Sequence, residues 1–186
     1  RSHVGATRAS VYNHVVLPTV YESLEADYWH LREHVQIWDV ACQVQVEVRG
    51  PDALKFVEFL TPRDVSKCVP GQCIYAPLLD EHAGVVNDPI ILCLSADRYW
   101  LSISDSDVLL WAKGLAVGGG FDVEVHDPDV FPLSLQGPQS ETLLSRLIAE
   151  PVEDIRFFRF IHSRIADIDL VVARTGWSGQ GGFELY

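Results

Sequence analysis

A carboxamide and a carboxylate, Asn87 and Asp88, stand side by side in a stretch that is otherwise apolar. Val85 and Val86 precede them and residues 90–94 follow, a pattern that predicts a strand. Polar groups in a buried strand are costly unless they are paired, and Pro89 removes a ladder donor, which indicates an edge or a bulge. Breaks of this kind are expected at functional sites. A binding site and a solvated pair of edge strands both account for the pattern.

The segment before Asn87 completes a predicted hairpin. Residues 75–79 are apolar and β-prone, and residues 80–84 form a polar turn that ends in a glycine. Residues 75–88 therefore predict strand, tight turn, strand, and we expect the rest of the chain to be organised around them.

Two glycine-rich stretches, 118–120 and 176–182, do not match a phosphate-binding loop. The first ends a predicted helix and leads into a strand, whereas a dinucleotide loop runs from strand to helix. The second lacks the Lys-Ser/Thr pair and precedes a strand. Two interpretations account for this second stretch: its backbone closely approaches a ligand, or it is a plain hairpin turn.

Metal binding is not favoured by the histidine spacing. His30 and His34 lie four residues apart on a predicted helix, a spacing that could share a metal. The zincin Glu and a third ligand are not in view, so a solvated helix face is the favoured interpretation and no metal site is predicted.

Residues 44–127 predict the element order strand, helix, strand, strand, strand, helix, strand. The first helix is opened by Pro51 and Asp52 and has the apolar stripe Ala53, Phe56, Val57 and Leu60. This order is typical of an α+β domain with an antiparallel sheet and helices on one face.

The flanking segments predict a second set of elements. A helix is expected at 23–34 with Ser23 as its cap, and another at 138–147. Strands are expected at 133–137, 157–160 and 168–173. Because a further strand begins at Phe183 and the chain stops at Tyr186, we expect a fragment of a longer protein.

Composition narrows the classes of partner. The chain has 186 residues, enough for one large or two small domains, and 48% of them are hydrophobic. The formal net charge of −12 argues against nucleic acid and anionic membranes. No apolar run reaches the roughly 18 residues of a membrane span, and no secretory signal opens the chain. The four cysteines favour buried thiols in a reducing cytoplasm, with a disulfide pair as the less favoured alternative.

Short motifs run through the chain in a recognisable order. They are Ile37-Trp38-Asp39-Val40, Asp64-Val65-Ser66-Lys67, Pro70-Gly71, Tyr75, Gly84-Val85-Val86-Asn87-Asp88, Leu135-Gln136-Gly137-Pro138, Arg174-Thr175-Gly176-Trp177-Ser178-Gly179 and Gly182-Phe183-Glu184-Leu185-Tyr186. In this order they resemble the glycine-cleavage T-protein (aminomethyltransferase) family of tetrahydrofolate enzymes. The resemblance extends from about Tyr12 to the last residue.

Four stretches resemble the branch of this family that demethylates dimethylsulfoniopropionate: 11–18, 38–41, 87–89 and 104–110. Aminomethyltransferases usually carry two Asp where this chain has Asn87 and Asp88, and an Asn-containing stretch where it has residues 104–106. These departures favour demethylation over aminomethyl transfer.

The resemblance implies an α+β, folate-binding T-protein fold, in which three domains form a ring around a folate channel. Residues 1–43 and 130–186 would form the first, discontinuous folate-binding domain, incomplete at its C-terminus. Residues 44–129 would form the inserted ferredoxin-like domain with its antiparallel sheet. The C-terminal barrel domain is expected to be absent from this fragment, which leaves the folate site incomplete.

The resemblance also implies roles for five residues. Asp88 matches the acidic residue that holds the reactive ring of the folate and is the catalytic candidate. Tyr75 matches an aromatic pocket residue, and Ser104 stands where the family has a pocket Asn. Trp177 matches a loop Tyr, and Glu184 the acidic residue that hydrogen-bonds the pterin. These types suit the task, because a carboxylate can bind the polar pterin edge bidentately and an aromatic ring can stack on its face.

The implied reaction is methyl transfer from a sulfonium such as dimethylsulfoniopropionate to N5 of tetrahydrofolate, giving 5-methyltetrahydrofolate. Because a sulfonium methyl is already activated, the protein would contribute in-line positioning and a dry channel. Tyr12, Trp38 and Trp177 are candidates to hold the cationic sulfur by cation–π attraction, with core packing as the alternative for each.

Alternative functions are aminomethyl transfer in the glycine cleavage system, another N- or O-demethylation, and folate binding without turnover. The expected partner is a small-molecule methyl donor, and neither nucleic acid nor a membrane is expected as a partner. The sequence is compatible with a homodimer.

Overall fold

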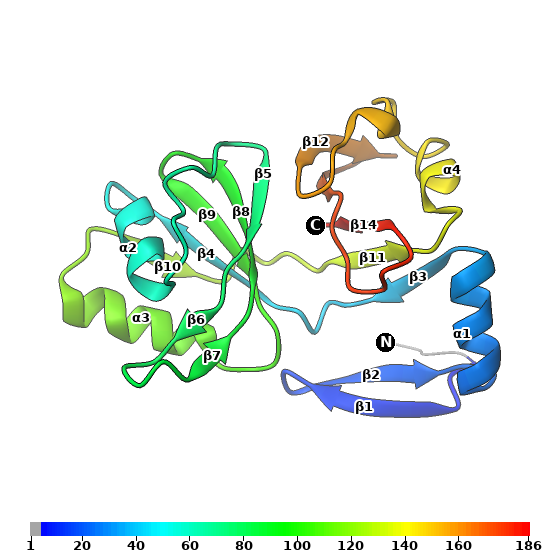
Figure 1. The fold of residues 1–186 in the computed structure, drawn as a ribbon, viewed down its shortest axis with the longest axis horizontal. Helices are drawn as coiled ribbons and strands as arrows, with labels where there is room; N and C mark the ends of the chain where they lie inside the picture. Colours follow the sequence, from blue (N-terminus) through cyan, green and yellow to red (C-terminus); the bar gives the residue numbers. More distant parts are fainter. Residues whose placement is uncertain (1–4) are drawn as a thin grey trace. The chain divides into compact units, whose positions relative to one another are not determined.

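The computed structural model describes residues 5–186, which fold into two compact units (Figure 1). Unit 1 combines the chain up to Cys42 with Pro132–Tyr186, and unit 2 is Gln43–Phe131. Each unit has its own five-stranded sheet and its own hydrophobic core.

Unit 2 is an antiparallel sheet with the strand order β10-β4-β9-β8-β5 and a small accessory pair, β6-β7. Its elements are β4 (Gln45–Arg49), α2 (Ala53–Leu60), β5 (Gln72–Tyr75), β6 (Leu78–Leu79), β7 (Val85–Asn87), β8 (Ile90–Ser95), β9 (Arg98–Ser102), α3 (Val108–Gly119) and β10 (Glu124–His126). Helices α2 and α3 pack on one face of the sheet, as the element order predicts.

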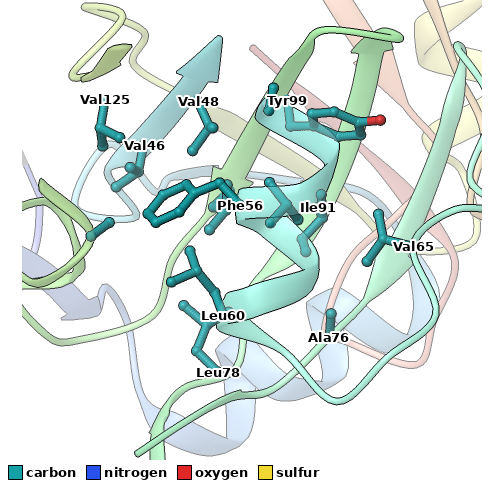
Figure 2. Packing of buried hydrophobic residues seen from close by; sticks show 14 of the residues in the cluster. Val46, Val48, Phe56, Leu60, Val65, Ala76, Leu78, Ile91, Tyr99 and Val125 are labelled. Carbon is teal, nitrogen blue, oxygen red and sulfur yellow. The ribbon is translucent and has the colours of Figure 1, made fainter. Parts of the chain in front are cut away.

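Alternation along the strands separates the two faces of this sheet. In β4, Val46 and Val48 join the core under the helices, whereas Gln45 and Glu47 point to the opposite face. Figure 2 shows Phe56 of α2 among these core side chains. Each such buried apolar side chain contributes on the order of 2 kcal/mol.

The predicted hairpin at residues 75–94 is present, but the prediction of two continuous strands was wrong. The first strand divides into β5 and β6 and the second into β7 and β8, so that β5 pairs with β8 and β6 with β7. Pro77 and Pro89 lie at these interruptions and have no N–H to donate. Ala76 N donates to Pro89 O at 3.1 Å across the gap. Asp88 therefore lies in a break between strands rather than inside one.

Unit 1 is built on an antiparallel sheet with the order β12-β13-β14-β11-β3 and a separate hairpin, β1-β2. Its elements are β1 (Arg8–Tyr12), β2 (Val15–Val20), α1 (Leu24–Glu33), β3 (Gln36–Asp39), β11 (Leu133–Gln136), α4 (Ser140–Leu144), the 3-10 helix η1 (Val152–Asp154), β12 (Phe160–Ile165), β13 (Ile168–Ala173) and β14 (Gly182–Leu185). Its core is formed by Leu135, Leu144, Ile148, Val152, Ile155, Val172 and Phe183.

Two predictions in unit 1 need correction and one is confirmed. Ser23 caps α1, since its Oγ accepts a hydrogen bond from Ala26 N at 3.1 Å. The strand expected at 157–160 instead starts at Phe160, because Phe158 has a φ of 58°, which a strand does not allow. The helix expected at 138–147 is shorter and spans Ser140–Leu144.

The four cysteines are buried, as predicted, and Cys68 and Cys93 donate to the carbonyls of Gln72 and Ser95. Over residues 5–186, no helix combines the length and the hydropathy that crossing a membrane requires.

Candidate functional site

Asp88 of unit 2 is held by two hydroxyl groups. Tyr75 Oη donates to Asp88 Oδ2 at 3.2 Å, and Ser104 Oγ donates to Asp88 Oδ1 at 2.7 Å. The structure thus brings together three of the predicted site residues. Because each carboxylate oxygen can accept more than one hydrogen bond, both oxygens keep capacity for a ligand.

The strand pairing explains why these three residues meet. Ile90, at the start of β8, pairs with Tyr75 on one side and with Ser102 of β9 on the other. Asp88 precedes this position by two residues, and Ser104 follows Ser102 by two. Tyr75, Asp88 and Ser104 therefore gather at one end of the sheet, where β5 and β9 end and β8 begins.

The Tyr75 side chain is a donor with an accessible ring. Partial burial, together with the negative charge of Asp88, raises the pKa of the Tyr75 phenol, so it keeps its proton at neutral pH. The residue is still 41% exposed, which leaves part of the ring face available for stacking.

In unit 1, the strand register places Trp38 and Glu184 in one cross-strand row. Both pair with Ser134 of the strand between them, so all three side chains point to the same face of the sheet. Leu135 and Phe183 point to the other face, into the core. Trp38 Nε1 donates to Gln36 Oε1 at 2.8 Å, which orients the indole on this polar face.

Glu184 is buried and is bound only by hydroxyl groups. Thr175 Oγ1 and Tyr186 Oη both donate to Glu184 Oε2, the latter at 3.1 Å. Neither a hydrogen bond to Oε1 nor an ion pair of Glu184 is found in the described part of the chain. Burial raises the pKa of the Glu184 carboxyl, and the two hydroxyls counter this only in part.

The glycine-rich loop at 174–182 is anchored by Gln136 of β11. Gln136 Nε2 donates to Thr175 O at 3.5 Å, and Ser178 Oγ donates to Gln136 Oε1 at 2.6 Å. Trp177, between these anchors, is 69% exposed. The hydrogen bonds to Gln136 therefore hold the loop on both sides of Trp177, and the indole is exposed.

Two of the three residues predicted to hold the cationic sulfur, Trp38 and Tyr12, lie in different places within unit 1. Trp38 lines a groove of about 740 Å³ together with parts of β2 and α1, among them Tyr28 and Leu31. Tyr12 pairs with Val15 at the tip of the β1-β2 hairpin and is not among the residues that line this groove. This groove therefore contains Trp38 but not Tyr12.

The histidine pair on α1 forms a ring contact. The rings of His30 and His34 have centroids 4.9 Å apart. Over residues 5–186, no group of three or more His, Cys, Asp or Glu side chains is arranged to hold a metal ion.

Three residues that no sequence argument had placed in the site support these clusters, Gln136, Thr175 and Tyr186, and Asn87, noted in the sequence beside Asp88, joins them without a predicted role. All four belong to the ordered motifs quoted above, but a motif does not show which side chain binds which.

Comparison with known proteins decides the family. Residues 2–186 match the family described as GCVT N-terminal domain. The chain belongs to this family. The prediction of the family and of its α+β folate-binding fold is confirmed.

Two curated relatives illustrate the range of the family. The chain is 50% identical over 182 residues to the dimethylsulfoniopropionate demethylase DmdA of Ruegeria pomeroyi, covering 98% of this chain and 50% of that protein. It is 35% identical to an aminomethyltransferase of Halalkalibacterium halodurans, with 91% and 47% coverage. The chain thus spans about half the length of the curated relatives it matches.

Solved structures agree with the fold. The glycine cleavage system aminomethyltransferase T from Bartonella henselae superposes with a TM-score of 0.85 at 26% identity, over 97% of this chain and 49% of that one. A heterotetrameric sarcosine oxidase from Corynebacterium sp. U-96 gives a TM-score of 0.60 at 20% identity, a similarity of fold alone.

Proposed function

We propose that the protein is a tetrahydrofolate-dependent methyltransferase that demethylates a small sulfonium, with dimethylsulfoniopropionate as the leading substrate. The observation that carries this proposal is the 50% identity, over 98% of the chain, to a dimethylsulfoniopropionate demethylase. We further propose that unit 1 corresponds to the discontinuous folate-binding domain, that unit 2 is the inserted domain, and that the enzyme works in the cytoplasm.

The two carboxyl groups fit a folate ligand. Asp88 is oriented by two hydroxyl donors and keeps acceptor capacity on both oxygens, so it can accept an N–H of a pterin-like ring. The exposed part of the Tyr75 ring is available to stack on such a ring. When bound, tetrahydrofolate would supply the N5 amine that accepts the methyl group.

Glu184 would hold the pterin edge through one oxygen rather than two. Oε2 already accepts two hydroxyl hydrogen bonds, so Oε1 is the atom left to meet a ligand. In the ionised state Oε1 accepts an N–H. In the neutral state, which burial favours, the proton sits on Oε1 and can be donated to a ring acceptor.

The methyl donor would be held by aromatic faces. Trp38 lines the groove of unit 1, and Trp177 is largely exposed on its loop, so each can face a cationic sulfur. Tyr12, on the β1-β2 hairpin, is a further candidate to face the cationic sulfur. The chain's task in the transfer is to orient the donor and to exclude water, because the sulfonium already carries the leaving group.

The test is a panel of methyl donors with tetrahydrofolate and the full-length protein, followed by chromatography of 5-methyltetrahydrofolate. We expect turnover with dimethylsulfoniopropionate that falls about 100-fold or more in Asp88→Ala, because a positioned charge at the reacting ring is lost. Ser95→Ala is a matched control, since Ser95 also donates to a carboxylate, Asp97, at 2.6 Å, but on a distant turn.

Three outcomes separate the candidate functions. Turnover of an aminomethyl donor in place of any sulfonium would favour the aminomethyltransferase alternative, which the 35% identity to such an enzyme supports. Folate binding without turnover on any sulfonium, amine or ether would leave only a binding protein. If Asp88→Ala and Ser95→Ala lost turnover equally, Asp88 would have no specific role in the reaction.

A further inference from the structure

Asn87 uses every polar atom of its side chain, although it is only 4% exposed. Its Oδ1 accepts a hydrogen bond from Ser104 N at 3.0 Å. Its Nδ2 donates to Ser104 O at 3.1 Å and to Ser106 Oγ at 2.7 Å. Ser106 Oγ in turn donates to Val86 O at 3.1 Å. We call Asn87, Ser104 and Ser106 with these bonds the amide clasp.

The amide clasp fixes Ser104 through its backbone. The Asn87 carboxamide binds both the N–H and the carbonyl of Ser104, as a neighbouring strand would, at a point beyond the end of β9. The side chain of Ser104 is left to donate to Asp88 Oδ1 at 2.7 Å. Asn87 and Asp88 are adjacent in sequence, yet they meet through Ser104, a residue that follows β9.

We propose that Asn87 is a positioning residue that sets the orientation of the Asp88 carboxylate by way of Ser104. The assignment of a ligand to Asp88 rests on the proposed function, whereas the clasp rests on contacts within unit 2 alone. A serine hydroxyl has one proton and can rotate freely, so a hydrogen bond from it holds a carboxylate only when its own backbone is held.

The carboxamide is chemically specific at this position. A carboxylate of the same shape at residue 87 could still accept from Ser104 N, but it would set a charged oxygen against Ser104 O. The groups that hydrogen-bond the Asn87 carboxamide, Ser104 N, Ser104 O and Ser106 Oγ, are all uncharged, so a buried charge at this side chain would not be paired by any of them. An alanine would leave the N–H and the carbonyl of Ser104 without their partner.

The experiment is a double-mutant cycle in the full-length protein with Asn87→Ala, Ser104→Ala and the double variant. Affinity for tetrahydrofolate is measured by calorimetry. We expect about a tenfold loss for Asn87→Ala, because two groups lose their hydrogen-bond partner. In the Ser104→Ala background the same substitution should cost much less, since the link to Asp88 is already broken. With Ser95→Ala as control background, the losses should add.

A second readout needs no ligand. The charge of Asp88 contributes to the raised pKa of the Tyr75 phenol, so displacement of Asp88 should move that pKa down toward 10. The phenol is followed by ultraviolet difference titration of each variant against the same variant carrying Tyr75→Phe. We expect the downward shift in Asn87→Ala and not in Ser95→Ala. If Asn87→Ala does not fold, Ser106→Ala, which removes one arm of the clasp, takes its place in both measurements.

The two readouts fail in different ways. A shifted Tyr75 pKa in a protein that does not bind tetrahydrofolate would keep the positioning role and reject the proposed function. Additive affinity losses together with an unchanged Tyr75 pKa would reject the positioning role, whether or not the folate binds.

Discussion

Two buried glutamates, one in each unit, are held in opposite ways. Glu47 of β4 accepts hydrogen bonds from Arg98 Nε at 2.8 Å and Trp100 Nε1 at 2.6 Å, and His126 Nε2 lies 3.4 Å from its other oxygen. Within residues 5–186, Glu184 of β14 is bound only by the hydroxyls of Thr175 and Tyr186.

Both glutamates are buried, so the difference between their pKa values comes from the hydrogen-bond donors around each carboxyl. Burial opposes the charge of Glu47, but the hydrogen bonds from Arg98 and Trp100 and the nearby positive charges outweigh it, so its pKa is lowered. Burial dominates at Glu184, and its pKa is raised. The Arg98 guanidinium balances the charge of Glu47, although both hydrogen bonds fall on Oε2 and the buried Oε1 accepts none within residues 5–186. Glu184 has hydroxyl donors in place of a cation, so its charge is not balanced, and its Oε1 keeps capacity for a ligand.

The largest expected difference is in stability. Glu47→Leu leaves the Arg98 guanidinium and the buried Trp100 N–H without their acceptor, and we expect it to lower the free energy of unfolding by about 3 kcal/mol. Glu184→Leu removes an acid that burial already disfavours, and we expect a loss of about 1 kcal/mol. Urea unfolding of both variants measures this, and equal losses would contradict the distinction.

The pH dependence should have opposite signs. The raised pKa of Glu184 means that its contribution to stability is complete below the ordinary Glu value of about 4.3 and is lost as pH rises through the raised value. The lowered pKa of Glu47 means that its contribution is complete above about 4.3 and is lost as pH falls through the lowered value.

Unfolding free energies measured across pH for the parent protein, Glu184→Gln and Glu47→Gln test these signs. We expect Glu184→Gln to flatten the decline at higher pH and Glu47→Gln to flatten the decline in acid. A single group can contribute at most about 1.4 kcal/mol per pH unit. Parallel profiles for the two variants would show that the donors do not set the sign.

The smallest expected effect is that of a single hydroxyl. Thr175→Val keeps the shape of the side chain and removes one of the two donors to Glu184 Oε2, so the pKa of Glu184 should rise further. Affinity for tetrahydrofolate should fall about fivefold. Carbon-13 NMR titration and calorimetry measure the two effects. Ser163→Ala, which removes a hydroxyl that donates to Glu150 in the same unit, should change neither.

Much of the architecture could be predicted from local patterns. The apolar stripe of α2 and the Ser23 cap of α1 are visible in the sequence and present in the structure. The strand predicted at 157–160 from its aromatic residues was wrong, because a strand-like composition does not reveal the left-handed backbone of Phe158.

The candidate site could be predicted only as a set of residues. Motif order made Asp88 and Glu184 candidates, but the partners of each come from other segments, since Ser104 follows Asp88 by 16 residues and Thr175 precedes Glu184 by 9. The departures at Asn87 and at 104–106 were interpreted as separate cues, yet the structure shows them in direct contact. Such pairings depend on strand register, which short motifs do not encode.

The anchoring of the glycine-rich loop has a consequence for directed evolution of the proposed donor site. A Cβ at Gly176 would come within 2.3 Å of the Gln136 side chain, and a Cβ at Gly182 within 2.6 Å of it. These two glycines leave space for the Gln136 side chain that anchors the loop. We therefore expect substitutions at either position to displace Gln136 and to disrupt the conformation of the loop. Trp177 is largely exposed, so diversity introduced at 177 would leave the scaffold unchanged. Gly179 has open space around it but a φ of 66°, so a side chain at 179 would strain the backbone.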